Sequence, residues 1–248
     1  MISIQKNDYY IKISYVNDTK EYSGINADKE RDYYDEVFKR AKRQVLDYGY
    51  NNPWTHFITL TIDNKKADIT NPNKLVKRVL RQFNNFQQRF DEDFKYILIP
   101  ELGSKTGRLH FHGLVYLSNT ERLKFMFMND DFGVPVYRDD WFYKNIGANQ
   151  FTKINYQSPA IIRYITKYMQ KNTVRIFDRC YYCSKGLKKS IYVIKPVKND
   201  NLESDFYNRF LYDQYAHNTP YATSYELDIS KFDVIIQWLD ERGVNYET

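Results

Sequence analysis

Two apolar segments separated by a short polar turn constrain the fold of this chain more than any other feature. Lys95–Leu102 (KYILIPEL) and Leu109–Leu117 (LHFHGLVYL) have the β-branched and aromatic content of strands. The residues between them, GSKTGR, include two glycines, which favour a tight turn. This pattern predicts an antiparallel β-hairpin, so the fold must contain a sheet that accepts both strands.

Further strands and helices are predicted on both sides of the hairpin. Strand patterns occur at Ile11–Val16, Phe57–Ile62, Phe151–Tyr156 and Ile191–Ile194. Helix patterns occur at Asp28–Tyr48, Pro72–Phe90, Asn119–Met128, Ser158–Lys171, Glu203–Asn218 and Ser230–Arg242. Asp130–Asn149 holds Gly, Pro and turn-prone residues, which predicts a loop. Together these elements predict an α+β fold in which basic helices pack on strands near the middle of the chain.

The composition indicates a folded protein with an affinity for polyanions. Its 42% hydrophobic content excludes disorder throughout the chain. A net charge of +6 combined with 24 tyrosines favours nucleic acid, through phosphate pairing and base stacking. No apolar segment approaches the ~20 residues of a membrane span, and the N-terminus has no apolar signal core. We expect a soluble, cytoplasmic protein without a membrane partner, in which Cys180 and Cys183 are reduced thiols.

A pair of histidines stands on the second strand of the predicted hairpin. His110 and His112 are two positions apart, so their side chains point to the same face of a strand, where two imidazoles can bind one cation. In a paired hairpin, Glu101 lies opposite them and adds a carboxylate to that face. Two histidines and one carboxylate leave positions open for water and substrate, and these donors predict Mn²⁺ or Mg²⁺.

A second group of chemically active side chains lies on the predicted helix Ser158–Lys171. Helical spacing places four of them on one face: Tyr164, Lys167, Tyr168 and Lys171. A phenol is a poor nucleophile at pH 7, but a neighbouring lysine favours the phenolate and a metal can polarise the phosphate that it attacks. The combination predicts cleavage of a phosphodiester with the tyrosine covalently linked to phosphate.

Three ordered segments resemble the motifs of HUH-type rolling-circle replication initiators, which cut and rejoin single-stranded DNA. They are FITLTID (Phe57–Asp63), ELGSKTGRLHFHGLVY (Glu101–Tyr116) and YITKYMQK (Tyr164–Lys171), which resemble the first, metal and tyrosine motifs. The two-tyrosine form of the last segment is similar to the initiators of microvirus-type single-stranded DNA phages and related plasmids. Trp141, Gly147 and Ser184–Leu187 also fit that group. The resemblance covers residues 53 to 195.

This resemblance implies a central antiparallel sheet of about five strands, RRM-like, with the histidine pair on a central strand. It implies that His110, His112 and Glu101 bind the divalent ion. It also implies that Tyr164 or Tyr168 attacks the scissile phosphate, giving a 5′-phosphotyrosine and a free 3′-OH that primes synthesis. The second tyrosine would then cut after one round and allow rejoining. Lys167 and Lys171 would steady the phosphate.

The expected partners are single-stranded DNA at a replication origin and the helicase and polymerase of a bacterial host. The chain has no G-x-x-x-x-G-K-[ST] motif, so no fused helicase domain is expected. Basic side chains of the turn and of a helix are the candidate DNA contacts: Lys105, Arg108, Lys74 and Arg78. We expect residues 1–195 to form the endonuclease domain and 196–248 a helical extension packed on it. Thr59 and Thr61 are expected to serve the core and backbone.

Three alternatives remain open at this point. A relaxase or transposase would use the same chemistry. A non-catalytic RRM-like module would bind single-stranded nucleic acid by stacking bases on tyrosine and phenylalanine. A zinc protein would combine Cys180 and Cys183 with His110 and His112. Metal-dependent nicking that survives Cys180→Ala separates the enzymes from the other two.

Overall fold

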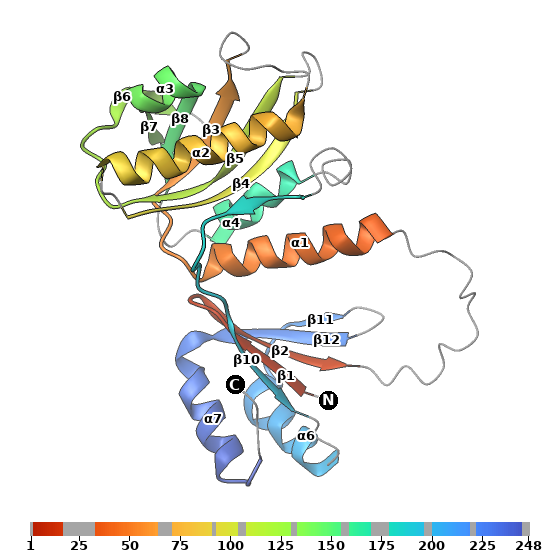
Figure 1. The fold of residues 1–248 in the computed structure, drawn as a ribbon. Helices are drawn as coiled ribbons and strands as arrows, with labels where there is room; N and C mark the ends of the chain where they lie inside the picture. The colour runs from red at the N-terminus through yellow and green to blue at the C-terminus, as the bar shows by residue number, and fades with distance from the viewer. Residues whose placement is uncertain are drawn as a thin grey trace. The chain divides into compact units, whose positions relative to one another are not determined.

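The computed structural model describes residues 2–16, 33–63, 71–90, 93–103, 108–129, 133–154, 159–169, 179–195, 200–218 and 222–244. The chain divides into two compact units, each with its own antiparallel sheet (Figure 1). Residues 31–187 form the inserted unit, and residues 1–30 together with 188–248 form the split unit. The expected boundary at residue 195 was wrong, because β1 (Ile2–Lys6) pairs with β10 (Ile191–Lys195) and so joins segments from both sides of the inserted unit.

The inserted unit is built on a sheet that has seven strands within the described residues, in the order β6-β7-β8-β3-β5-β4-β9. Their bounds are β3 His56–Ile62, β4 Phe94–Leu102, β5 Leu109–Leu117, β6 Lys124–Asn129, β7 Val134–Arg138, β8 Gly147–Lys153 and β9 Tyr182–Cys183. The expectation of about five strands was too low, because the chain adds strands at both edges. The histidine strand β5 lies between β3 and β4, in the central position that the resemblance implied.

Strands β4 and β5 form the predicted hairpin. Their register places Glu101 opposite His110, as the hairpin prediction required. The residue after the histidine pair explains how closely these strands approach. A Cβ atom added at Gly113 would lie 1.9 Å from the carbonyl oxygen of Ile97, so only glycine fits there.

Helices cover both faces of this sheet (Figure 1). Helix α2 (Pro72–Phe90) packs its apolar side chains on one face, against a core that includes Phe111. Because side chains alternate along a strand, His110 and His112 point to the opposite face. Helix α4 (Pro159–Ile165) lies on that opposite face, and α1 (Tyr33–Tyr50) packs against α4. The histidines and the tyrosine helix therefore share one side of the sheet.

Two local predictions were wrong. Asn119–Met128 is not a helix, because Lys124–Asn129 pairs with β7 as the edge strand β6. Asp130–Asn149 is not a plain loop, because it contains β7, α3 (Asp140–Asn145) and the start of β8. Both errors have one cause: a partner strand supplies hydrogen bonds that local sequence does not reveal.

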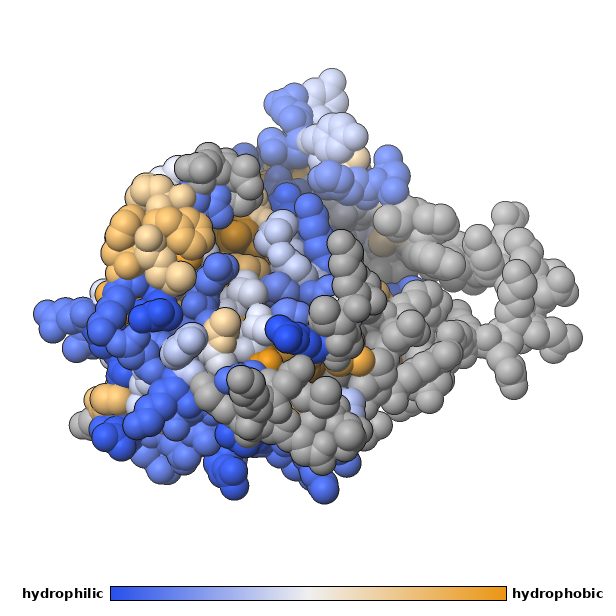
Figure 2. Space-filling view, turned by 90° about the horizontal axis from the view of Figure 1, so that it is seen from above, coloured by the Kyte–Doolittle hydropathy of each residue, from blue (hydrophilic) through white to orange (hydrophobic). Residues whose placement is uncertain are grey.

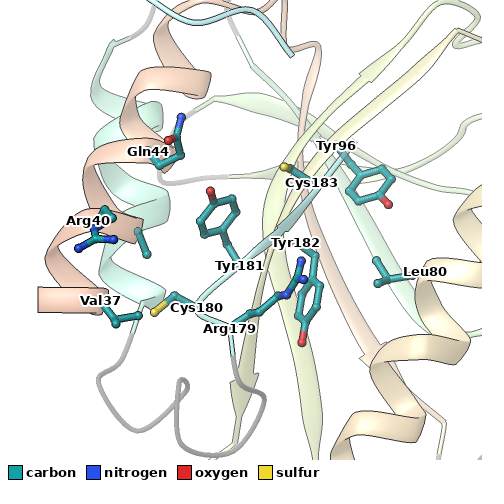
Figure 3. A pocket seen from close by; sticks show the side chains of 11 residues that line it. Val37, Arg40, Gln44, Leu80, Tyr96, Arg179, Cys180, Tyr181, Tyr182 and Cys183 are labelled. Carbon is teal, nitrogen blue, oxygen red and sulfur yellow. The ribbon is translucent and has the colours of Figure 1, made fainter. Parts of the chain in front are cut away.

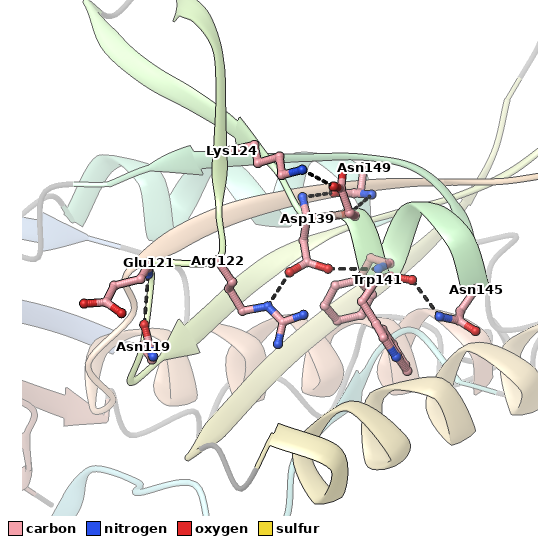
Figure 4. A network of polar contacts seen from close by, with 10 residues as sticks. Asn119, Glu121, Arg122, Lys124, Asp139, Trp141, Asn145 and Asn149 are labelled. Carbon is pink, nitrogen blue, oxygen red and sulfur yellow. Dashed lines mark hydrogen bonds and ion pairs between the residues drawn. The ribbon is translucent and has the colours of Figure 1, made fainter.

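A buried polar network holds α3 against β8 (Figure 4). Asp139, 1% exposed, caps α3 by accepting a hydrogen bond from the amide of Phe142 at 2.9 Å, and it also pairs with Arg122. The side chain of Asn149 in β8 bonds both the amide and the carbonyl oxygen of Asp139, at 2.9 and 3.0 Å. These bonds fix the strand that carries Gln150 and Thr152 next to β3.

Edge strand β6 has an unusually exposed apolar surface. Its four central side chains are 41–60% exposed: Phe125, Met126, Phe127 and Met128. Figure 2 shows an apolar patch on the side of the view where β6 lies in Figure 1. A β-bulge between Phe125 and Phe127 interrupts the pairing of this strand with β7, a feature that disfavours edge-to-edge aggregation.

The split unit has its own sheet and core. Within the described residues the strand order is β10-β1-β2-β12-β11, with β2 Tyr10–Val16, β11 Ala216–Asn218 and β12 Ala222–Asp228. Its helical segments are α6 Asp200–Phe206, the π-turn η3 Tyr207–Leu211, the 3₁₀ turn η4 Ile229–Lys231 and α7 Phe232–Asp240. The helix predicted at Glu203–Asn218 therefore ends early and gives way to β11. Within the part of the chain that is described, no helix is both long and apolar enough to cross a bilayer.

Candidate active site

The histidine pair is oriented by two hydroxyl groups from the neighbouring strand. His110 and His112 stand opposite Thr61 and Thr59 of β3. The hydroxyl oxygen of Thr61 lies 2.9 Å from Nδ1 of His110, and that of Thr59 lies 3.4 Å from Nδ1 of His112. The two rings are nearly parallel, at 22°. With both Nδ1 atoms engaged, the Nε2 atoms are left for other partners.

Glu101 contributes its carboxylate to the same face, as predicted. Its Oε2 atom lies 2.9 Å from Nε2 of His112, and both side chains are largely sheltered from solvent. Burial, and then the neighbouring His110, lower the pKa of His112 to about 4. The imidazole is therefore neutral at pH 7, and its Nε2–H donates to Glu101.

The three side chains fit a divalent cation by donor chemistry. Two imidazole nitrogens and one carboxylate oxygen form a mixed set of the kind that binds such ions, and Nδ1 contacts that orient the ligands are typical of metal sites. In this arrangement, however, no three His, Cys, Asp or Glu side chains of the described residues are placed as a metal-binding group. Glu101 and His112 instead contact each other directly.

Both candidate nucleophiles lie beside the histidine pair. Tyr164 lies in the last turn of α4, and Tyr168 ends the 3₁₀ turn η2 (Thr166–Tyr168) that follows it. The Tyr168 ring stacks on the His112 ring, with centroids 3.8 Å apart and planes 12° from parallel. Tyr168 Oη donates a hydrogen bond to Tyr164 Oη at 2.8 Å. The structure thus brings Glu101, His112 and both tyrosines together on one face of the sheet.

The two phenols differ electrostatically. Burial, the hydrogen bond with Tyr164 and the charges of Tyr164 and Glu101 all raise the pKa of Tyr168 well above its usual range. Tyr168 is therefore held as the neutral hydrogen-bond donor, in contrast to the expectation that lysine would favour a phenolate at both positions. Lys167 is exposed, and its Nζ lies 5.1 Å from the centroid of the Tyr164 ring, so the cation is near Tyr164.

The other predicted site residues are not all brought to this face. Lys171 and Lys105 lie outside the described residues. Arg108 is exposed at the start of β5, where its carbonyl oxygen accepts from the Gly103 amide at 2.9 Å. Lys74 and Arg78 belong to α2, which covers the opposite face of the sheet. DNA bound at the histidines would therefore not reach Lys74 or Arg78 on the same face.

Sequence reasoning missed three residues of the site. Thr59 and Thr61 were assigned to the core and backbone, but both contact the histidines. The signal was their alternation with Ile58, Leu60 and Ile62, which places them on the histidine face once β3 pairs with β5. Phe57 was also overlooked, and its ring lies 5.8–6.2 Å from those of Tyr164, Tyr168 and His112.

The two cysteines belong to a different place in the inserted unit. Cys180 and Cys183 line a pocket of about 430 Å³ between α1, α2 and the β4–β9 edge, together with Arg40, Gln44 and Tyr96 (Figure 3). Burial raises the pKa of the Cys180 thiol to about 11, so it stays protonated at pH 7. A zinc site that combines the cysteines with the histidine pair is therefore not supported by this arrangement.

One comparison with known proteins gave a match. Residues 55–173 match the model of a family described as replication-associated protein, of the ORF2 type. This part of the chain is similar to replication-associated proteins. The match is slightly shorter than half of the chain, and it supports a role in replication initiation. Searches of the curated proteins and of the solved structures found no significant match.

The stretch similar to replication-associated proteins coincides with the candidate site. It begins just before β3 and ends shortly after Tyr168, so it includes the threonines, Glu101, the histidine pair and both tyrosines. It leaves out Cys180 and Cys183, and it leaves out the whole split unit. The similarity therefore concerns the histidine–tyrosine face and the sheet that carries it.

Proposed function

We propose that this chain is a single-strand DNA endonuclease and ligase that starts and ends rolling-circle replication. The observation that carries this proposal is the stacking of Tyr168 on His112 at 3.8 Å, which sets two hydrogen-bonded phenols beside a His/His/Glu group. The match to replication-associated proteins supports the same role. The proposed partners are single-stranded DNA at an origin and the helicase and polymerase of a bacterial host, in its cytoplasm.

We assign the first attack to Tyr164. Its oxygen accepts the hydrogen bond from Tyr168, and a donated hydrogen bond stabilises a phenolate. The Lys167 ammonium near its ring acts in the same direction. In the step, Tyr164 Oη forms a bond to phosphorus and the bond to the 3′ oxygen breaks. The phenol loses a proton, and the released 3′ oxygen takes one up, leaving a 5′-phosphotyrosine and a 3′-OH.

Glu101, His110 and His112 are the residues that would hold Mn²⁺ or Mg²⁺. A bound cation would supply polarisation of the scissile phosphate. The chain's own contribution is to place the neutral imidazole of His112 and the Glu101 carboxylate beside the phenols. Thr59 and Thr61 fix the two rings through their Nδ1 atoms.

The presence of two tyrosines favours a replication initiator over a related one-tyrosine transposase. Tyr168 lies one hydrogen bond from Tyr164, so after the first cut its hydroxyl is next to the new phosphotyrosine. A second cut by Tyr168 would release the first strand end for rejoining. The same pair gives a purely binding protein no evident advantage, because the two hydroxyl groups are spent on each other.

A denaturing gel tests this proposal. The purified chain is incubated with a random-sequence pool of single-stranded DNA and Mn²⁺, beside Tyr164→Phe, Tyr168→Phe and the double variant. We expect a covalent protein–DNA band for the wild type. It should fall on the order of 10³-fold or more in Tyr164→Phe and persist, more weakly, in Tyr168→Phe.

Two results would contradict the proposal. Folded protein that binds the pool but gives no covalent band with either Mn²⁺ or Mg²⁺ would favour the non-catalytic binding module. An equal band in all four proteins would place the nucleophile elsewhere. Cys180→Ala serves as a control variant and should leave the band unchanged, because this thiol lines a separate pocket.

A further inference from the structure

A second cavity opens directly beside the proposed nucleophile. It has a volume of about 380 Å³ and lies on the histidine face of the sheet. Its residues are Phe57, Thr59, Asn129, Val134, Gln150, Thr152, Lys153, Ile154, Ile161 and Tyr164. One wall is Tyr164 itself, and its floor includes Thr59, which contacts His112. Whatever occupies this cavity therefore lies next to the group that cuts the strand.

Three separate parts of the fold build the cavity. The floor comes from paired residues of β3 and β8, since Phe57 stands opposite Thr152 and Thr59 opposite Gln150. The tyrosine helix α4 supplies Ile161 and Tyr164 on one side. Asn129 at the end of β6 and Val134 at the start of β7 line it as well. Because two of these parts also form the catalytic face, the cavity is continuous with it.

The chemistry of the lining selects a planar, uncharged and polar-edged ligand. Phe57 and Tyr164 offer aromatic surfaces of the kind on which bases stack. The amide of Gln150 and the hydroxyl of Thr152 offer donors and acceptors of the kind that bind base edges. The lining contains no carboxylate and one cation, Lys153, among the described residues, so it matches neither a metal nor a phosphate cluster.

We propose that this cavity takes one unstacked nucleobase that flanks the scissile phosphate, and that Gln150 helps to select that base. This inference rests on the proposed function for its substrate, single-stranded DNA. A base held here would anchor the strand so that the adjoining phosphate meets Tyr164 Oη. Gln150 is exposed on the floor of the cavity, so its side chain is available to a ligand without repacking of the core.

One random single-stranded DNA pool gives two independent readouts. The DNA retained under native conditions reports binding, and the DNA linked to protein or released after denaturation reports cutting. The full chain is compared with Gln150→Ala, Gln150→Glu and the control Gln88→Ala, an exposed glutamine of α2 that lies on the helix covering the opposite face. Sequencing gives the base preference at each position around the nick.

We expect the wild type and Gln88→Ala to share a strong preference at one position next to the nick. Gln150→Ala should reduce that preference about tenfold at this position and leave the other positions unchanged. Gln150→Glu should move it toward bases that present an amino group, because the carboxylate only accepts hydrogen bonds. A merely structural role of Gln150 would not change which base is selected.

The two readouts separate the failure of the two proposals. Covalent adduct with identical profiles for the wild type and both Gln150 variants would overturn the base pocket and leave the endonuclease intact. Absence of adduct, with a bound fraction whose profile still changes with Gln150, would support the pocket and overturn the chemistry. A bound fraction insensitive to Gln150 and no adduct would overturn both.

Discussion

Thr59 and Thr61 act through the histidines and not on the substrate. Each hydroxyl contacts a ring nitrogen and leaves the other nitrogen of that ring facing the site. Loss of such an orienting contact typically weakens metal binding 10- to 100-fold. Thr61→Val is the sharper test, because its 2.9 Å contact is shorter than the 3.4 Å contact of Thr59.

We predict that Thr61→Val raises the Mn²⁺ concentration for half-maximal adduct formation about 10- to 100-fold. The measurement is a Mn²⁺ titration on the denaturing gel. Thr61→Ser keeps the hydroxyl and should restore the wild-type midpoint, whereas Thr223→Val in the split unit should not shift it. An unchanged midpoint in Thr61→Val would show that the hydroxyl does not orient His110.

His56 predicts a pH dependence of stability. It is 3% exposed, packs edge-on against Tyr137 and Phe151, and burial followed by Lys153 lowers its pKa to about 4. The unfolded chain binds the proton below about pH 6.5, while the folded chain resists it down to about pH 4. Its contribution to stability is therefore present above pH 6.5 and lost as the pH falls through that window.

We expect the free energy of unfolding to decrease by up to about 1.4 kcal/mol per pH unit from His56 between pH 6.5 and 4. Urea unfolding at a series of pH values measures this slope, and His112 adds a contribution of the same sign. His56→Gln should make the slope shallower. A slope that is the same in both proteins would mean that the folded chain protonates His56 as readily as the unfolded chain does.

At the scale of single residues, spacing alone identified the groups with the strongest chemical signature. His110, His112 and Glu101 were found because a hairpin register brings them to one face, and the tyrosines because of helical spacing. Thr59, Phe57 and Gln150 could not be found in this way. Their importance depends on which strand lies beside β3, and this pairing is set by the tertiary fold.

Asp139 is the residue on which the element α3 depends. Its carboxylate caps the helix and pairs with Arg122, whose guanidinium lies 3.6 Å from the centroid of the Phe90 ring. The side chain of Asn149 closes the network on β8 (Figure 4). Removal of the carboxylate therefore costs a helix cap and leaves a partly buried guanidinium without its ion pair.

We predict that Asp139→Ala lowers the free energy of unfolding by about 2–4 kcal/mol. Asp140→Ala is the matched control, since this neighbouring carboxylate makes its ion pairs with Lys124 and Arg138 at the surface. Chemical denaturation should show a much smaller change for the control. Equal effects of the two substitutions would mean that burial of the Asp139 network adds nothing.

Elements with strong internal patterns were predictable, and elements defined by a partner were not. Helix α2 was predicted with its observed bounds because its apolar stripe is continuous. Strand β6 (KFMFMN) was mistaken for helix because Lys, Met and Phe give no period-2 contrast, and both kinds of side chain are exposed. Strands β1, β11 and β12 were missed for a similar reason: they are completed by segments distant in the sequence.

At the scale of the whole molecule, the inserted unit has the requirements for independent folding. Its sheet, both covering helices and the apolar core all come from residues 31–187, and the split unit has a separate core. We predict that residues 31–187 expressed alone unfold in one cooperative thermal transition and still form the covalent adduct. Circular dichroism and the denaturing gel check the two parts. A gradual, non-cooperative melt of this fragment would show that the split unit is needed for the fold.

The pairing of β1 with β10 has a consequence for how the protein is made. The ribosome produces β1 and β2 first, but Gln5 meets its hydrogen-bond partner Ser190 only 185 positions later. The inserted unit can therefore fold on the emerging chain while Ile2, Ile4, Ile11 and Ile13 still wait for the partners that bury them. During this interval the nascent chain exposes an apolar hairpin, which makes it a client for chaperones. A polypeptide released early would hold a folded catalytic unit on an unfinished support.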